Sequence, residues 1–151
     1  MDNKQLEEFI VSLDKGPEVK IGKQFCEVIL PPEKLHSFAL LMKENEQLKF
    51  NFLFCLSGVD YGDALGVIYH LRSTEFNHTV VLKTKTTDRI NPVLDSVTDL
   101  WHTADFHERE VFDLLGIKFN NHPDLRRFFM EDSAGYPLRK DYVDEINIVT
   151  K

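Results

Sequence analysis

Residues 49–85 read KFNFLFCLSGVDYGDALGVIYHLRSTEFNHTVVLKTK, and this stretch decides the fold. At positions 50–57, 65–71 and 79–85, alternate residues fall on opposite sides of an extended chain and one side is mainly apolar. This is the period of two typical of strands. Turn-forming residues separate the three runs. The stretch therefore predicts a three-stranded meander whose first strand is central in the sheet. One side of that first strand is expected to carry Phe50, Phe52, Phe54 and Leu56.

Helix and strand signals alternate before the meander. Residues 6–13 place apolar side chains on one helical face, and the Asp-Asn pair at 2–3 offers an N-cap. Residues 19–21 and 25–30 predict two short strands joined by a hairpin turn. A second amphipathic helix is expected over residues 32–45, since proline suits the first turn of a helix.

After the meander, the chain returns to helix. Residues 95–101 predict one short helical turn, and Thr103 can cap a longer helix over residues 104–115. Gly116 supplies the left-handed residue that commonly ends a helix. Beyond Phe119 the sequence shows no sustained period of either kind.

The order α-β-β-α-β-β-β-α predicts an α+β fold. We expect a two-layer domain over residues 1–116, with a mixed sheet of about five strands and helices on one face. Residues 117–151 are expected to form an extended, irregular C-terminal docking arm, because this segment is too aromatic for ordinary disorder. Its apolar anchors are Phe119, Leu125, Phe128, Phe129, Met130, Tyr136, Leu138 and Tyr142, interleaved with Arg126, Arg127, Arg139 and Lys140.

Composition limits the possible functions. The chain has 151 residues, 42% of them hydrophobic, which suits one globular domain. Its 18 basic and 25 acidic residues give a net charge of -7, which argues against general binding to nucleic acid or anionic lipid. The sequence has no apolar run of about 18 residues and no signal or transit pattern at its start. Any membrane association is therefore expected to be indirect.

Redox and metal centres are not expected. Cys26 and Cys55 lie far apart in apolar runs and are predicted to be buried thiols, too few for an iron–sulfur cluster or a structural zinc site. The candidate metal ligands resist a common site, because His102 and His107 are five residues apart and point in different directions on a helix. The other members of that group are Glu108, Glu110, Asp113 and His122.

The charged residues near the C-terminus allow two interpretations. The Glu-Arg-Glu sequence at 108–110 is either a solvated helix turn, with Arg109 able to pair with Asp113, or part of a polar network that holds the arm. The basic pairs at 126–127 and 139–140 can also bind a phosphate, but neighbouring acids nearly cancel them and no glycine-rich phosphate loop accompanies them.

Three motifs occur in order in the last third of the chain. They are EREVFDLLGI at 108–117, HPDLRR at 122–127 and GYPLRKDY at 135–142. Together they resemble the 30-kilodalton subunit, also called the C subunit, of respiratory complex I. The order of predicted elements before them is similar to that family's fold, so the resemblance spans essentially the whole chain.

The resemblance implies a non-catalytic structural subunit in the hydrophilic arm of a proton-translocating NADH:quinone oxidoreductase, peripheral to the cytoplasmic side of the bacterial inner membrane. It implies packing against the large subunit of the quinone site and against neighbouring iron–sulfur subunits. The complex uses NADH, FMN, iron–sulfur clusters and quinone, and this chain is expected to bind none of them. The residues carried over as interface or arm-ordering residues are Glu108, Arg109, Glu110, Asp113, His122, Asp124, Arg126, Arg127, Arg139, Lys140 and Asp141.

Two other functions stay open at this point. Related subunits occur in plastoquinone-reducing, deazaflavin-oxidising and hydrogenase membrane complexes, so the electron donor and acceptor are not fixed by the resemblance. A free-standing enzyme that uses a metal or flavin near His102 and His122 is the alternative from another class.

Overall fold

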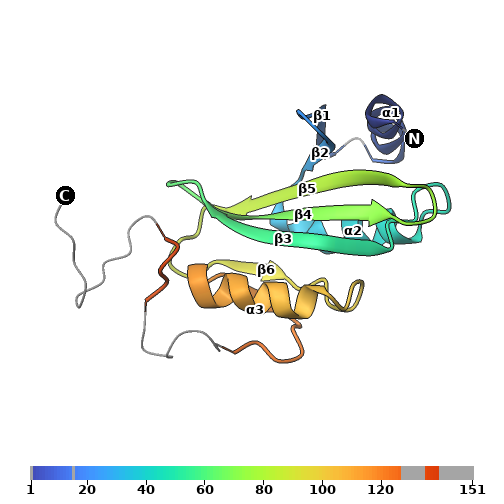
Figure 1. Cartoon of the computed structure of the whole chain (residues 1–151). Helices are drawn as coiled ribbons and strands as arrows, with labels where there is room; N and C mark the ends of the chain where they lie inside the picture. The colour runs from blue at the N-terminus through green and yellow to red at the C-terminus, as the bar shows by residue number, and fades with distance from the viewer. Residues whose placement is uncertain (1, 15, 127–134, 140–151) are drawn as a thin grey trace.

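The computed structural model describes residues 2–14, 16–126 and 135–139. Within them, the main sheet has five strands in the order β1-β2-β5-β4-β3 (Figure 1). Only β2 and β5 run parallel in it, so the sheet is mixed. The predicted α+β class, the hairpin and the meander are confirmed. The strands are β1 (Glu18–Ile21), β2 (Cys26–Ile29), β3 (Phe52–Asp60), β4 (Leu65–Ser73) and β5 (His78–Thr86).

Strand β3 lies at the edge of the sheet, so the prediction of a central position is wrong. The reason is that β5 pairs with β2 on its free side, which leaves β3 with β4 alone. The predicted faces of β3 are also wrong, because the register shifts at a bulge between Leu53 and Cys55. Leu53 and Leu56 are buried, whereas Phe52 and Phe54 are 43% and 39% exposed.

The first two helices follow the predictions. Helix α1 (Asn3–Leu13) begins with a capping box in which Asp2 and Gln5 bond each other's backbone. Helix α2 (Leu35–Glu44) follows a short 3-10 turn, η1 (Pro32–Lys34), that starts at the predicted proline. Both expected helices are confirmed, with α2 itself beginning after the turn.

The third helix, α3 (Ala104–Leu115), has the predicted bounds. Thr103 occupies the N-cap position, but its hydroxyl donates to the Leu53 carbonyl (2.9 Å), so the predicted side-chain cap is wrong. The predicted turn before it is present, since the amides of Leu100 and Trp101 both donate to the Val97 carbonyl. Tertiary contacts with β3 therefore fix the start of α3 in place of a local cap.

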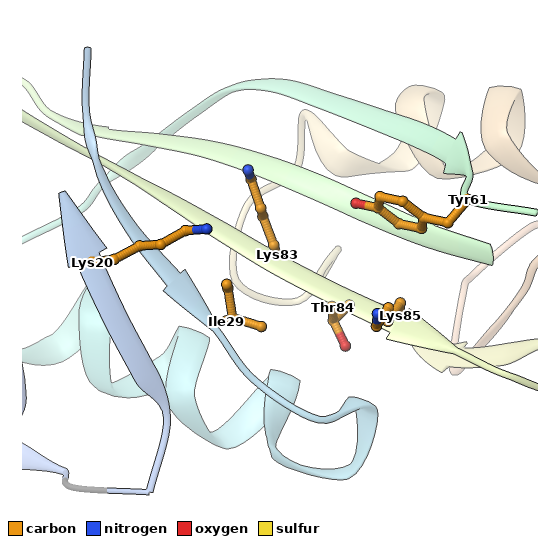
Figure 2. Close-up of a pocket in the computed structure, with 6 residues that line it drawn as sticks. All are labelled: Lys20, Ile29, Tyr61, Lys83, Thr84 and Lys85. Carbon is orange, nitrogen blue, oxygen red and sulfur yellow. The ribbon is translucent and has the colours of Figure 1, made fainter. Parts of the chain in front are cut away.

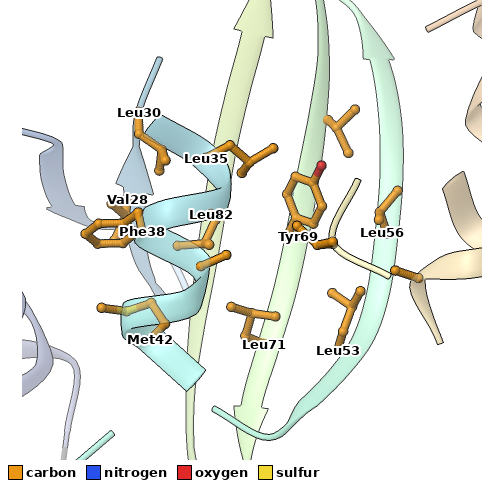
Figure 3. Close-up of a cluster of buried hydrophobic side chains, with 14 of the residues drawn as sticks. Val28, Leu30, Leu35, Phe38, Met42, Leu53, Leu56, Tyr69, Leu71 and Leu82 are labelled. Carbon is orange, nitrogen blue, oxygen red and sulfur yellow. The ribbon is translucent and has the colours of Figure 1, made fainter. Parts of the chain in front are cut away.

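The helices α1, α2 and α3 of the described residues contribute to one hydrophobic core. Figure 3 shows α2 crossing the sheet, with Phe38 and Met42 among the strand side chains. Helix α1 adds Leu6 and Ile10, and α3 adds Val111 and Leu115. The sheet contributes, among others, Val28, Leu53, Leu56, Val67, Tyr69, Leu71, Val80 and Leu82.

Two short strands were not predicted. Strand β6 (Val93–Asp95) and strand β7 (Lys118–Asn120) form a parallel pair beside α3. Their middle residues, Leu94 and Phe119, are buried in the core. Three residues are too few to show a period of two, so the sequence pattern does not reveal these strands.

Candidate functional site

Helix α3 packs closely against the edge strand β3, and this contact forms a groove. Gly58 lies at the closest approach, where a β-carbon would stand 2.3 Å from the Leu115 Cδ1 atom and 3.1 Å from Val111. Only glycine lets the helix approach the strand this closely. The resulting α3 groove has a volume of about 230 Å³ and is lined by Leu56, Ser57, Gly58, Glu110, Val111, Leu114, Leu115 and Leu138.

Residues 135–139 lie over the C-terminal end of α3. Gly116 ends the helix with φ 79°, and the Leu138 amide donates to the Leu114 carbonyl (3.0 Å). Arg139 Nε donates to the Leu115 carbonyl (2.6 Å). The last carbonyls of a helix have no partner inside the helix and carry partial negative charge, so both donors stabilise this end.

Arg139 also connects the helix end to the loop after the meander. One of its terminal nitrogens donates to the Arg89 carbonyl (3.0 Å). The Arg89 side chain in turn forms two bonds, of 2.6 and 3.0 Å, with the carboxylate of Asp60 at the end of β3. The hydrogen bonds from Arg139 to Arg89 and from Arg89 to Asp60 therefore hold together segments that are far apart in the sequence.

A second cluster of charged residues lies along the first turns of α3. The His122 side chain is fully buried, and its Nδ1 accepts from the Asp124 amide (3.0 Å). Its Nε2 therefore carries the proton, and it lies 3.1 Å from the Asp105 carbonyl oxygen. Arg109 Nε lies 3.2 Å from the Asp105 carboxylate. His122 thus holds residues 122–124 against the first turn of α3.

Glu108 lies inside the molecule, so the interpretation as part of a solvated helix turn is wrong for this residue. It is completely buried and accepts from the Ser96 hydroxyl (2.6 Å) and the Val97 amide (3.0 Å). Among the described residues, its carboxylate therefore holds the turn before α3. Burial raises the pKa of Glu108 from 4.5 to about 7, although the bonds from Ser96 and Val97 oppose this shift.

The candidate residues fall into separate groups. Arg109, His122, Asp124 and Arg126 lie together, with Arg126 Nε 3.2 Å from the Asp124 carboxylate. Glu108 and Asp113 are buried in α3, Glu110 lines the α3 groove, and Arg139 lies at the other end of the helix. The predicted residues that lie outside the described part of the chain are Arg127, Phe128, Phe129, Met130, Lys140, Asp141 and Tyr142.

The sequence pattern does not indicate Asp60 and Arg89 as candidate residues. They stand 29 residues apart on a strand end and a loop, so no spacing rule connects them. Within residues 2–14, 16–126 and 135–139, His, Cys, Asp and Glu side chains form no group of three or more that can hold a metal ion. None of the helices in these ranges is both long and apolar enough to cross a membrane.

Comparison with known proteins gives consistent matches. Residues 28–146 match the family described as respiratory-chain NADH dehydrogenase, 30 Kd subunit. The C/D subunit of NADH-quinone oxidoreductase from Phocaeicola vulgatus is 47% identical over 120 residues, which cover 78% of this chain and 23% of that protein. The C subunit from Chlorobium phaeobacteroides is 43% identical over 118 residues, which cover 76% of this chain and 70% of that protein.

The chain spans less than a quarter of the length of the C/D relative and 70% of the Chlorobium relative. A chain in the archaeal membrane-bound sulfane sulfur reductase, described as a respiratory membrane complex, has a similar structure, with a TM-score of 0.80 and 23% identity. That match covers 95% of this chain and 86% of the archaeal one, and at this identity it shows a common fold. The resemblance carried by the three C-terminal motifs is confirmed, and the chain belongs to the family of the 30-kilodalton subunit, or C subunit, of respiratory-chain NADH dehydrogenase.

Proposed function

We propose that this chain is a non-catalytic structural subunit in the hydrophilic arm of a proton-translocating NADH:quinone oxidoreductase. Its task is to pack against the large quinone-site subunit and so support electron transfer from NADH to quinone. The flavin, the iron–sulfur clusters and the quinone belong to other subunits. As part of this complex, the chain is peripheral to the cytoplasmic side of the bacterial inner membrane.

One observation carries this proposal: charged residues of the C-terminal motifs form hydrogen bonds that hold the backbone of other segments in place. Arg139 bonds two backbone carbonyls, and His122 lies within hydrogen-bond distance of a third, that of Asp105. Catalytic side chains converge instead on a space that a reacting atom can occupy. An arrangement that fixes chain segments on a helix is what a docking surface needs, since preorganisation lowers the entropic cost of association.

In this proposal the large quinone-site subunit is the D subunit. Its choice as the partner rests on the fused relatives. The Phocaeicola vulgatus protein is named as a C/D subunit, so the C and D parts form one polypeptide there. Fusion keeps two modules at a high effective concentration, which favours partners that are bound to each other. We therefore propose the D subunit as the neighbour of this chain.

The proposed contact lies at the α3 groove and its rim. Leu138 borders the groove and is 58% exposed. Ile90 is 97% exposed and follows Arg89, whose carbonyl accepts a hydrogen bond from Arg139. Exposed aliphatic side chains beside a preformed groove are typical anchors of a protein interface. Both are expected to become buried in the complex.

The test is the double variant Ile90→Glu/Leu138→Glu, expressed in the organism in place of the normal chain. We expect co-isolation with the D subunit to fall at least about ten-fold, together with the NADH:quinone activity of the membranes, because two charges would enter an apolar contact. The thermal midpoint of the isolated variant should match that of the normal chain.

The matched control is Val11→Glu/Leu40→Glu, since these aliphatic side chains on α1 and α2 are each 40% exposed. The control should assemble normally. Normal assembly of the Ile90/Leu138 variant, or equal loss in the control, would overturn the proposed contact. Mass spectrometry of the subunits that co-isolate also identifies the electron-input module, which distinguishes an NADH-oxidising complex from the related membrane complexes.

A further inference from the structure

The sheet has a second surface, opposite the helices, that the proposed contact does not use. Strand register places the side chains of His70 and Cys55 together on this surface, and likewise those of Val81 and Glu27 and those of Ile68 and Lys83. The core-facing residues of the same strands, such as Leu71 and Leu82, point to the other side (Figure 3). We call this surface the open face.

One half of the open face is aromatic. The rings of Phe52 and Phe54 stack at 6.3 Å, and His70 lies 5.5 Å from Phe54 and 6.1 Å from Phe25. Phe52 and Phe54 remain 43% and 39% exposed. Burial, and then the charge of Lys83, lowers the pKa of His70, so its ring is neutral at pH 7 and packs as an aromatic group.

The other half of the open face is basic and hollowed. Two hollows of about 620 and 220 Å³ share the side chains of Lys20 and Lys83, and Figure 2 shows both beside the smaller hollow. The linings also include Lys23 and Lys85, and the carboxylate among them is Glu27, which pairs with Lys83. Four lysines around one carboxylate form a positive patch on a chain whose net charge is -7.

The combination points to a specific kind of ligand. Surplus lysines need carboxylates or phosphates as counter-charges, and exposed rings beside them favour a ligand that also carries apolar side chains. A nucleic acid or a lipid surface is a long polyanion, which the remaining charge of the molecule repels. A peptide brings a few carboxylates and apolar side chains together and fits a recessed surface.

We infer that the open face binds an acidic, extended segment of a neighbouring protein chain, with carboxylates at Lys20, Lys83 and Lys85 and an apolar side chain against Phe54 and His70. This surface lies on the opposite side of the sheet from the α3 groove. The inference does not rest on the proposed contact with the D subunit.

The first experiment titrates the full chain, labelled for NMR, with a seven-residue peptide of glutamates that contains one leucine and one phenylalanine. We expect amide shifts concentrated at residues 52–55, 68–70 and 81–85, with binding near the millimolar range typical of a short isolated peptide. The counterpart peptide with glutamine in place of glutamate should bind about ten-fold more weakly, because electrostatic complementarity is lost.

Variants localise the effect. Lys83→Gln and Lys85→Gln together should weaken peptide binding about ten-fold, whereas Lys4→Gln, an exposed lysine on α1, should leave it unchanged. Equal binding of the glutamine peptide, shifts outside the open face, or tighter binding of a short DNA duplex or of anionic vesicles would overturn the inference.

A second experiment uses the assembled complex. A carbodiimide joins a lysine amine to a carboxylate only when the two groups are in contact. In membranes that contain the complex, we expect such cross-links from Lys83 or Lys85 to Asp or Glu residues of another subunit. Recovery of Lys4 cross-links without any from the open-face lysines would contradict the inference.

Discussion

Arg139 Nε donates a 2.6 Å hydrogen bond to the carbonyl of Leu115, the last residue of α3. The guanidinium comes from a residue 24 positions later and also reaches the Arg89 carbonyl, and its carbon lies 5.0 Å from the Tyr136 ring centroid. A positive side chain at this place offsets the negative end of the helix dipole. Arg139 thus joins the C-terminal segment, α3 and the loop after the meander at one point.

Two properties of the position require glycine at residue 116, namely its backbone conformation and the close approach of neighbouring side chains. Its φ of 79° disfavours a side chain, and a β-carbon would lie 2.7 Å from Tyr136 and 2.9 Å from Arg139. We expect Gly116→Ala to lower the free energy of unfolding by about 2–4 kcal/mol, measured in urea, because strain and overpacking add. The control is Gly62→Ala, where φ is 93° but the space is empty, so only about 1–2 kcal/mol of strain is expected. Equal losses in the two variants would contradict the role of the packing contact.

Arg139→Ala tests the docking of residues 135–139. The variant leaves two backbone carbonyls without their charged donor, so we expect amide exchange of Leu138 to accelerate about ten-fold while exchange in β4 and β5 stays unchanged. Arg126→Ala serves as the control, since the Arg126 side chain is 69% exposed and its pair with Asp124 contributes little. Unchanged exchange of Leu138 in Arg139→Ala would show that the segment is held by other contacts.

Glu108 predicts a specific dependence of stability on pH. Its pKa is about 7 in the folded chain and near 4.5 when unfolded, so the folded state binds the extra proton between these values. The stability it contributes is fully present below pH 4.5 and is lost as the pH rises through 7. We expect the free energy of unfolding of the normal chain, relative to Glu108→Gln, to fall by about 2–3 kcal/mol between about pH 5 and pH 8.

The comparison with Glu108→Gln is needed because two histidines act in the opposite direction. Burial lowers the pKa of both His70 and His78, so their contribution to stability is lost as the pH falls below 6.5. Both proteins share these histidines, and the difference between them isolates Glu108. A difference that does not change with pH would show that the buried carboxylate does not titrate in this range.

Gly58 sets the distance between α3 and β3. Because a β-carbon there would stand 2.3 Å from Leu115 Cδ1, we expect Gly58→Ala to lower the free energy of unfolding by about 1–3 kcal/mol. Combining it with Leu115→Ala removes the clash, so the double variant should lose less than the sum of the two single losses. Strict additivity, measured by chemical denaturation, would mean that the two residues do not press on each other.

Local pattern was enough to predict most of the elements. The helix over 104–115, its end at Gly116 and the meander over 50–85 depend on side-chain period and on residues with special backbone preferences, and these properties belong to short stretches of chain. The prediction failed where a distant segment intervened. Strand β3 lies at the edge because β2 pairs with β5, and around its bulge Phe52 and Phe54 are exposed, whereas Phe50 and Leu56 are buried.

The candidate residues show the same division. The order of charges in the three C-terminal motifs is a property of the sequence, and it was sufficient to indicate the family. The tertiary structure decided which groups these charged side chains contact. Glu108 is buried and bonds Ser96 in the turn before α3, and Arg139 donates to carbonyls at the end of α3 and in the loop at Arg89. Hydrogen bonds and ion pairs act only over a few ångströms, so partners 24 or 50 residues apart become partners only when the packing of the core brings their backbones together.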